Sequence, residues 1–467
     1  MGAVRRALGL ALGLAACGRS PDLSLDIRLP VDRSALKSIT RVNMTAMRQD
    51  VVLAQRSFSA SVATVSLSGI SHGSSTVIGI DGLDASGNVT GSGRTCPVDF
   101  EANGVVAPLY FAPTGYFLPT LGAPAKLRAE PIAAALDSGV VLVAGGASAD
   151  GDAAASVFGD SELFTPGLGT FATSAAALGV ARWRAAAVAT SGVGVVAIGG
   201  LDGSGAPIAN AELYSDVEQQ FMTLSSTQID GRVGHAAVLL PDDRVFVSGG
   251  SNTAGGDPIA TTFLLYVLAD GSFQVAAGPS LSVARRDHAA VVASGIPVVF
   301  GGVGAGGDVL DSIETLDPAA TAVASPVAAL TYARTQATAT LLSSSASSGS
   351  ILVVGGLGAD GSARADAELF NPVTRTTTVY SLSTGRYGHT ATLLADGRVL
   401  VAGGFDSSGN ALSSVELFAP DLASPGFLTA RSLDSARGNH RAITMCDDTV
   451  LFIGGAATAE IYSAPTS

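Results

Sequence analysis

The sequence predicts an all-β protein with two parts, a short N-terminal β domain and a longer array of repeated β units. Three observations support this prediction: a phrase that returns along the chain, evenly spaced pairs of glycine, and an alternation of polar and apolar residues ahead of the repeats. The phrase is clearest where residues 386–404 read RYGHTATLLADGRVLVAGG and residues 232–250 read RVGHAAVLLPDDRVFVSGG. A chain that repeats a phrase this closely builds one supersecondary unit many times.

Seven glycine pairs mark the period of the repeat. Their first glycines are separated by 54, 50, 52, 54, 48 and 51 residues. Each pair follows a short apolar run such as VVLVAGG or ILVVGG, which predicts a buried strand. Phrases such as AELYSD and VELFAP then predict a third strand, and weaker apolar segments predict a fourth. The pairs are Gly145-Gly146, Gly199-Gly200, Gly249-Gly250, Gly301-Gly302, Gly355-Gly356, Gly403-Gly404 and Gly454-Gly455.

This pattern resembles the kelch repeat over roughly residues 113–467. The resemblance implies a seven-bladed β-propeller with four strands in each blade. The last repeat has no fourth strand after AEIYSA, whereas residues 115–122 resemble the fourth strand that precedes the second repeat. We therefore expect residues 115–122 to supply the missing strand and close the ring. The tryptophan of the family's fourth strand is absent, and the residues expected in its place are Phe171, Phe221, Phe273 and Phe427.

Residues 23–112 lack the repeat and show a period of two instead. Leu23, Leu25 and Ile27 alternate with polar residues, and STVIGIDGLDASGNVTGSG predicts two strands joined by an Asp-Gly turn. This patterning predicts a small antiparallel β-sandwich, which resembles Ig-like or transthyretin-like modules. We expect the sandwich to act as a spacer.

Residues 1–17 predict a targeting segment rather than a part of the fold. Arg5 and Arg6 precede a short apolar run that ends in Leu-Ala-Ala-Cys17, and this arrangement resembles the lipobox of bacterial lipoproteins. The resemblance implies acylation of Cys17 and attachment to the cell envelope, at the outer membrane where the cell has one. An ordinary signal peptide is the alternative. Residues 18–22 then form a short linker.

Two cysteines remain, Cys96 and Cys446. In an oxidising envelope two exported thiols are more often paired than free, so we expect a disulfide between them. Such a bond would join the sandwich to the last repeat.

One arginine recurs at the start of each repeat, and a glutamate recurs on the third strand. Seven cations in a ring could bind an anion, but the matching glutamates favour repeated ion pairs between strands or blades. The third repeat is the expected exception, because Leu264 stands where the others carry glutamate. The arginines are Arg128, Arg182, Arg232, Arg285, Arg334, Arg386 and Arg437, and the glutamates are Glu162, Glu212, Glu314, Glu368, Glu416 and Glu460.

Four repeats carry a histidine three residues after that arginine, at His235, His288, His389 and His440. Imidazoles arranged around an axis could hold a metal ion. Because the other three repeats lack the histidine, the pattern favours hydrogen-bonded histidines of the scaffold. No metal and no cofactor is expected.

The function predicted from these features is binding in the cell envelope. A formal net charge of −13 argues against nucleic acid, so the expected partner is an envelope protein or a glycan, with membrane contact through the lipid anchor alone. The positions between the recurring arginine and histidine vary most, on the face where the long loops emerge. The candidate ligand-binding residues are Trp183, Arg184, Arg286, Asp287, Gln336, Tyr387 and Asn439.

A periplasmic carbohydrate-active enzyme, similar to sugar mutarotases or galactose oxidase, is the alternative function. The spacing of residues supports no Ser/His/Asp or Cys/His catalytic arrangement, so the sequence favours a binding or interaction module over an enzyme.

Overall fold

The computed structural model of the chain describes residues 12–13, 23–49, 51–60, 73–100, 105–148, 156–268, 270–319, 325–343 and 347–464. Strands dominate these residues, and the helical segments among them are the short 3-10 turns η1 (Ser34–Ser38), η2 (Pro166–Leu168) and η3 (Ala305–Gly307). Within the same residues, no helix has the length and apolar character needed to cross a membrane. Cys17 and the linker 18–22 lie outside the described residues, as does all of the expected targeting segment except Leu12 and Gly13.

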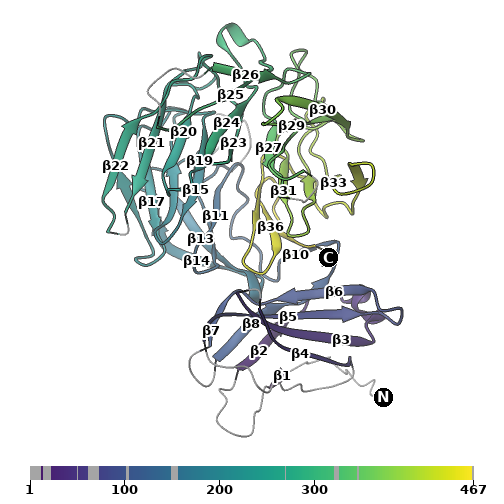
Figure 1. Cartoon of the computed structure of the whole chain (residues 1–467). Helices are drawn as coiled ribbons and strands as arrows, with labels where there is room; N and C mark the ends of the chain where they lie inside the picture. The colour runs from purple at the N-terminus through teal and green to yellow at the C-terminus, as the bar shows by residue number, and fades with distance from the viewer. Residues whose placement is uncertain are drawn as a thin grey trace.

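The N-terminal part consists of two sheets that share one hydrophobic core (Figure 1). Burial alternates along β3 (Arg41–Arg48), where Val42, Met44 and Ala46 face the core, as the period of two predicts. The larger sheet contains β4 (Val51–Ser59), β3 (Arg41–Arg48), β5 (Gly73–Leu83), β6 (Val89–Arg94) and β9 (Ala112–Pro113), with β7 (Val98–Phe100) also paired to β5. The smaller sheet contains β1 (Leu12–Gly13), β2 (Leu23–Arg28) and β8 (Val105–Tyr110). Because β2 and β8 run parallel, the expectation of a wholly antiparallel sandwich was wrong.

Seven four-stranded antiparallel sheets follow in the described residues, one for each repeat. The first sheet contains β11 (Ile132–Ala135), β12 (Val141–Ala144), β13 (Asp160–Thr165) and β14 (Thr170–Ala177). The second contains β15 (Ala186–Thr190), β16 (Gly194–Ile198), β17 (Ala211–Ser215) and β18 (Gln220–Leu224). The third contains β19 (Ala236–Leu239), β20 (Val245–Ser248), β21 (Thr262–Val267) and β22 (Phe273–Ala277). The fourth sheet contains β23 (Ala289–Ala293), β24 (Ile296–Phe300), β25 (Ser312–Thr315) and β26 (Ser325–Ala329). The fifth contains β27 (Thr338–Leu341), β28 (Ile351–Val354), β29 (Asp366–Asn371) and β30 (Thr376–Ser381). The sixth contains β31 (Thr390–Leu393), β32 (Val399–Ala402), β33 (Val415–Ala419) and β34 (Gly426–Thr429). The seventh combines β35 (Arg441–Thr444), β36 (Thr449–Ile453) and β37 (Glu460–Ser463) with β10 (Tyr116–Pro119).

The seventh sheet closes the structure on itself. Its outer strand β10 comes from the N-terminal side of the array and pairs with β37, so that Tyr116 lies opposite Ser463. This is the closing strand that the sequence predicted. The first strands of neighbouring sheets contact one another all the way round, including β11 with β35. A closed ring of four-stranded sheets is the β-propeller fold (Figure 1).

The glycine pairs mark the places where neighbouring backbones come closest. In the second sheet, a Cβ atom on Gly199 would lie 2.6 Å from the carbonyl oxygen of Arg232 in the next sheet. A Cβ on Gly200 would lie 2.5 Å from the carbonyl oxygen of Trp183, and both glycines have positive φ. Only glycine fits both the conformation and the space, which explains why the pair returns in every repeat.

Aromatic rings fill the outer part of several sheets. The ring centroids of a third-strand and a fourth-strand residue are 4.8 to 5.2 Å apart in the pairs Phe164–Phe171, Tyr214–Phe221 and Phe418–Phe427. Three of the four phenylalanines expected on fourth strands therefore pack as predicted, and Phe273 is partly buried against a neighbouring core cluster.

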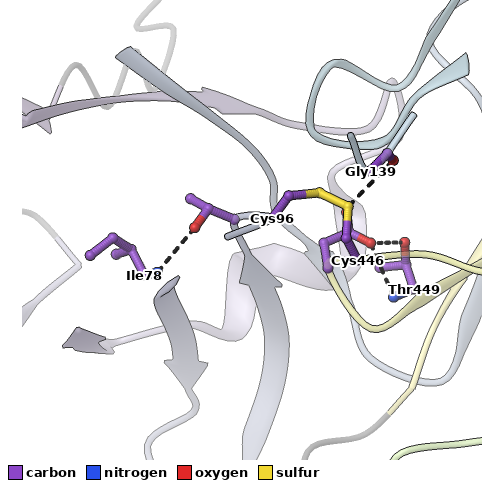
Figure 2. The surroundings of a disulfide bond; sticks show 7 residues. Ile78, Cys96, Gly139, Cys446 and Thr449 are labelled. Atoms are coloured by element: carbon purple, nitrogen blue, oxygen red, sulfur yellow. Dashed lines mark hydrogen bonds between the residues drawn. A yellow bond between two sulfur atoms is a disulfide. The ribbon is translucent and has the colours of Figure 1, made fainter. Parts of the chain in front are cut away.

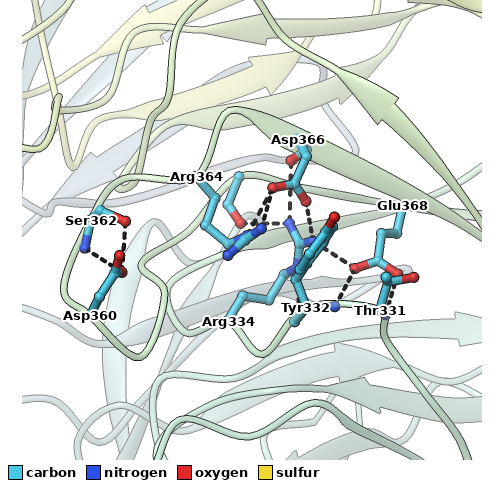
Figure 3. Close-up of polar contacts among 9 residues, drawn as sticks. Thr331, Tyr332, Arg334, Asp360, Ser362, Arg364, Asp366 and Glu368 are labelled. Atoms are coloured by element: carbon cyan, nitrogen blue, oxygen red, sulfur yellow. Dashed lines mark hydrogen bonds and ion pairs between the residues drawn. The ribbon is translucent and has the colours of Figure 1, made fainter.

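The seven recurring arginines form a buried layer, which we call the arginine layer; each is at most 1% exposed. Arg334 points toward Glu368 (Figure 3) and contacts it at 2.7 Å. Arg334 also donates to the carbonyl of Gly355 at 2.9 Å. Glu368 also accepts hydrogen bonds from the N–H groups of Thr331 and Tyr332, at 2.6 and 3.1 Å. Each pair therefore ties two strands to the loop that enters the sheet. The pairs are Arg128–Glu162, Arg182–Glu212, Arg285–Glu314, Arg334–Glu368, Arg386–Glu416 and Arg437–Glu460.

The third sheet is the exception that the sequence predicted, but the residue is Phe263 and not Leu264. In the strand register, Phe263 has the place that Glu212 has in the second sheet. A shift of one residue along a strand moves a side chain to the opposite face, which is why the sequence comparison misplaced it. Arg232 lies over the ring of Phe263 at 4.9 Å and pairs with Asp230.

A disulfide links Cys96 to Cys446 across 350 residues, with their Cα atoms 4.9 Å apart (Figure 2). Cys96 follows β6 in the N-terminal part, and Cys446 lies in the turn between β35 and β36. The turn between β11 and β12 packs against the bond, since a Cβ on Gly139 would lie 2.6 Å from the Cys446 sulfur. The bond thus fastens the N-terminal part to the propeller where its first and last sheets meet.

Candidate functional site

Two residues after each buried arginine, the backbone is left-handed. The φ angle at this position lies between 46° and 68° in all seven sheets. Several neighbours are linked through their backbones, because the N–H of Asp287 donates to Gly234 at 2.7 Å and that of Asn439 donates to Gly388 at 2.8 Å. We call these residues the left-handed ring: Glu130, Arg184, Gly234, Asp287, Gln336, Gly388 and Asn439.

Five members of the ring keep a side chain in this conformation. Glycine adopts it freely, whereas other residues lose about 1 kcal/mol of stability there. At Gly234 and Gly388 the absence of a side chain makes room for the next sheet, since a Cβ would lie 2.6 Å from Asp287 Oδ1 and 2.5 Å from Asn439 Oδ1, respectively. Polar side chains at five strained and equivalent positions make the left-handed ring a candidate site.

The ring surrounds a cavity of about 610 Å³ to which all seven sheets contribute. We call it the axial cavity. Its volume is within the range of sites for small molecules, which are concave and combine aromatic surface with a few polar groups. Most of the residues that the sequence singled out converge on it: Trp183, Arg184, Asp287, Gln336, Tyr387 and Asn439.

Arg286 is absent from the lining of the axial cavity, and its selection as a ligand-binding residue stays a prediction. Its backbone bridges to Val303 on the same sheet, and its guanidinium Nη1 contacts Asp287 Oδ2 at 2.6 Å. Arg286 therefore holds the Asp287 carboxylate in place. The sequence could not separate the two neighbours, because consecutive residues leave a strand end in different directions.

Charged side chains from four sheets line the axial cavity, at Glu130, Arg184, Asp287 and Arg441. The Arg184 guanidinium lies between two carboxylates, 3.6 Å from Glu130 and 3.5 Å from Asp287. Both distances exceed those of a direct hydrogen bond, so Arg184 balances the charge of the carboxylates without being held by a short contact. Asn439 Nδ2 donates to Glu130 at 3.3 Å.

Glu130, Phe405 and Arg441 also line the axial cavity and were not selected from the sequence. Counting two residues from every arginine would have found Glu130. Arg441 follows the last histidine, where the other repeats carry alanine, threonine or isoleucine, so no recurring pattern marks it. Burial lowers the pKa of Arg441, and the nearby Glu130 opposes this shift.

The four histidines also line the axial cavity. Three of them contact a hydroxyl of the preceding sheet through Nε2, in the pairs Ser248–His288 at 2.8 Å, Thr338–His389 at 3.0 Å and Thr390–His440 at 2.9 Å. Burial lowers the pKa of His235, His288 and His389 to about 3, and the arginine of the same repeat adds to the shift. These contacts are the scaffold role that the sequence favoured. In the described residues, no three His, Cys, Asp or Glu side chains are grouped as a metal site requires.

Comparison with known proteins adds a likeness in fold. No family model matches the chain, and no curated protein matches it. One solved structure that resembles it is "Structure of YjhT", with a TM-score of 0.46 and 15% sequence identity, covering 65% of this chain and 94% of that chain. At this identity the likeness concerns the fold alone, and the β-propeller is established by the sheets and the closed ring described above.

Proposed function

We propose that this chain is a seven-bladed, kelch-type propeller of the cell envelope that binds a saccharide in the axial cavity. The N-terminal sheets, as an Ig-like or transthyretin-like sandwich, would act as a spacer between a lipid anchor and the propeller. A concave cavity supports a small polar ligand better than a protein partner, which needs a larger and flatter contact surface.

The left-handed ring is the observation that carries the proposal. It directs carboxylate, amide and guanidinium groups into one cavity, and these groups form hydrogen bonds with sugar hydroxyls. Aromatic surface for the apolar faces of a sugar comes from Trp183 on one side and from Tyr387 with Phe405, whose ring centroids are 5.5 Å apart. Polar groups that fix orientation beside aromatic surface are typical of small-molecule sites.

Trp183 makes the proposal directly testable, because it is the one tryptophan of the chain. A glycan that enters the axial cavity should change the fluorescence of Trp183. For such a glycan, Trp183→Ala combined with Tyr387→Ala should lower the affinity at least tenfold in calorimetry, with little change in melting temperature. Tyr332→Ala is the matched control, since Tyr332 is 43% exposed and lies outside the lining of the cavity. Full affinity in the double variant would refute the site.

The lipid anchor is a separate part of the proposal. Replacing Cys17 with serine should release the protein from the membrane fraction, because a thiol is required for acylation. Membrane association that persists in the Cys17→Ser variant would contradict the anchor without affecting the saccharide site.

An enzyme acting on the same saccharide is the second candidate. The observation that favours it is the placement of Glu130 near the partly buried Arg441 in the cavity, which brings a carboxylate that can accept a proton beside a cation. Incubation of a bound sugar with the protein should then change the sugar, and Glu130→Gln should stop that change while binding persists. A sugar that is bound and recovered unchanged, with its anomers exchanging at the rate seen without protein, supports binding alone.

A further inference from the structure

A second cavity lies where the N-terminal part meets the propeller, and we call it the junction cavity. Its volume is about 220 Å³, and residues 92–94, 395–396, 447–449 and 463–464 line it. These segments belong to β6, to the turn between β31 and β32, to the turn between β35 and β36, and to the end of β37. The cavity adjoins the disulfide, since Cys446 directly precedes Asp447.

Asp447 is the unusual residue of the junction cavity. It is 3% exposed, and its Oδ1 accepts hydrogen bonds from Thr449, at 2.6 Å from Oγ1 and 3.2 Å from the backbone N–H. Its Oδ2 is buried and has no hydrogen-bond partner within the described part of the chain. A carboxylate oxygen in this position is costly when ionised, because neither water nor a donor compensates its charge.

The charged groups that face Asp447 do not neutralise it. In its own turn, Asp448 is paired with Arg94 from β6. In the neighbouring turn, Asp396 is paired with Arg398. Both cations are engaged by these other carboxylates, and no three acidic, histidine or cysteine side chains in the described residues are grouped to chelate a metal. A proton is therefore the cation that this arrangement favours.

We infer that the junction cavity is a pH-sensitive contact, in which protonation of Asp447 stabilises the docking of the N-terminal part on the propeller and ionisation weakens it. The linkage follows from burial, which raises the pKa of Asp447 from 3.8 to about 6; Asp448 adds to this shift and the Thr449 hydrogen bonds oppose it. The folded state therefore keeps the proton up to about pH 6, whereas the unfolded chain releases it near 3.8. Stability from this contact is present in acid and is lost as the pH rises from about 4 to about 6.

The disulfide gives the contact a second property. Because Cys96 and Cys446 stay bonded, ionisation of Asp447 loosens the junction without separating the two parts. The propeller would be held firmly on the N-terminal sheets in acid and would move more freely at neutral pH. This inference does not depend on the proposed saccharide site.

The rate at which a phosphine reductant cleaves the disulfide in the whole protein reports opening of the junction. Oxidised glutathione, reduced under the same conditions, corrects for the effect of pH on the reductant itself. Between pH 5 and pH 7.5 we expect the corrected rate for the wild type to rise several-fold, with a midpoint near 6. A corrected rate that does not change with pH would overturn the inference, and this measurement requires no variant.

Two variants identify the group responsible. Asp447→Asn keeps an oxygen for Thr449 but cannot ionise, so its corrected rate should be independent of pH and no higher than that of the wild type at pH 5. Asp448→Asn is the matched control, because it removes the Arg94 ion pair and leaves the buried carboxyl, so the rise near pH 6 should persist. A rise that persists in Asp447→Asn would assign the effect to another group and contradict the inference.

Discussion

The arginine layer and the left-handed ring lie two residues apart in every repeat, yet they differ in every other respect. The layer has the same residue in all seven sheets, at most 1% exposed and paired with a glutamate in six of them. The ring has five different polar side chains and two glycines around one cavity. Repetition of one residue marks what holds the sheets together, whereas variation at an equivalent position marks what can distinguish a ligand.

The largest effect should come from breaking one pair of the arginine layer. Arg285→Met would leave Glu314 fully buried without its cation, which typically lowers the free energy of unfolding by about 3–5 kcal/mol. Arg232→Met in the third sheet is the matched comparison, because its partner Asp230 is 37% exposed and stays hydrated. The free energy of unfolding of that variant should fall by about 1–2 kcal/mol, mainly because the hydrogen bonds to the carbonyls of Gly249 and Thr261 are lost. Urea unfolding measures both, and equal losses would contradict a layer held by buried charge pairs.

A second prediction asks whether the histidines behave as scaffold or as site. Burial holds the pKa of His288 at about 3 in the folded state, below its ordinary value of 6.5. As the pH falls below 6.5 the unfolded chain takes up a proton that the folded state refuses, so stability decreases with acid. The His288→Gln variant can keep the contact with Ser248 but cannot take up this proton. Between pH 7 and pH 5, the free energy of unfolding of the wild type should therefore fall by about 2 kcal/mol more than that of the variant. Parallel stability curves for the two proteins would show that the imidazole titrates freely, as a residue of an open site would.

The smallest effect on stability should come from the ring itself. Gln336→Gly removes a side chain from a position with φ of 53°, so the free energy of unfolding should rise by up to about 1 kcal/mol. Gly388→Ala is the reverse test; it should destabilise by about 1–2 kcal/mol, because φ is 60° and the new Cβ would press on Asn439 Oδ1. A loss of stability in Gln336→Gly would mean that the side chain supports the fold, and the contrast between ring and layer would fail.

Much of the architecture could be predicted because each repeat restates the same physical problem. Short apolar runs predict buried strands, and a returning arginine with a returning glutamate predicts an ion pair, since a buried charge needs a partner. The limit of this reasoning is visible at Phe263. Leu264 and Phe263 are both apolar, so composition could not show which of them faces Arg232, and only the strand register decides it.

The sequence by itself determined the all-β class, the strand that closes the ring, the Cys96–Cys446 pair and the face on which the candidate ligand-binding side chains gather. These follow from periodicity, from charge matching and from the two cysteines that remain after Cys17, all of which act within one repeat or across the whole composition. Only the tertiary structure decided which side chains meet. Glu130 and Arg441 are more than 300 residues apart in sequence yet line one cavity, while Asp447 is enclosed between two parts of the chain. Closure of the ring brings these segments together, and no local pattern carries information about a contact that exists only after closure.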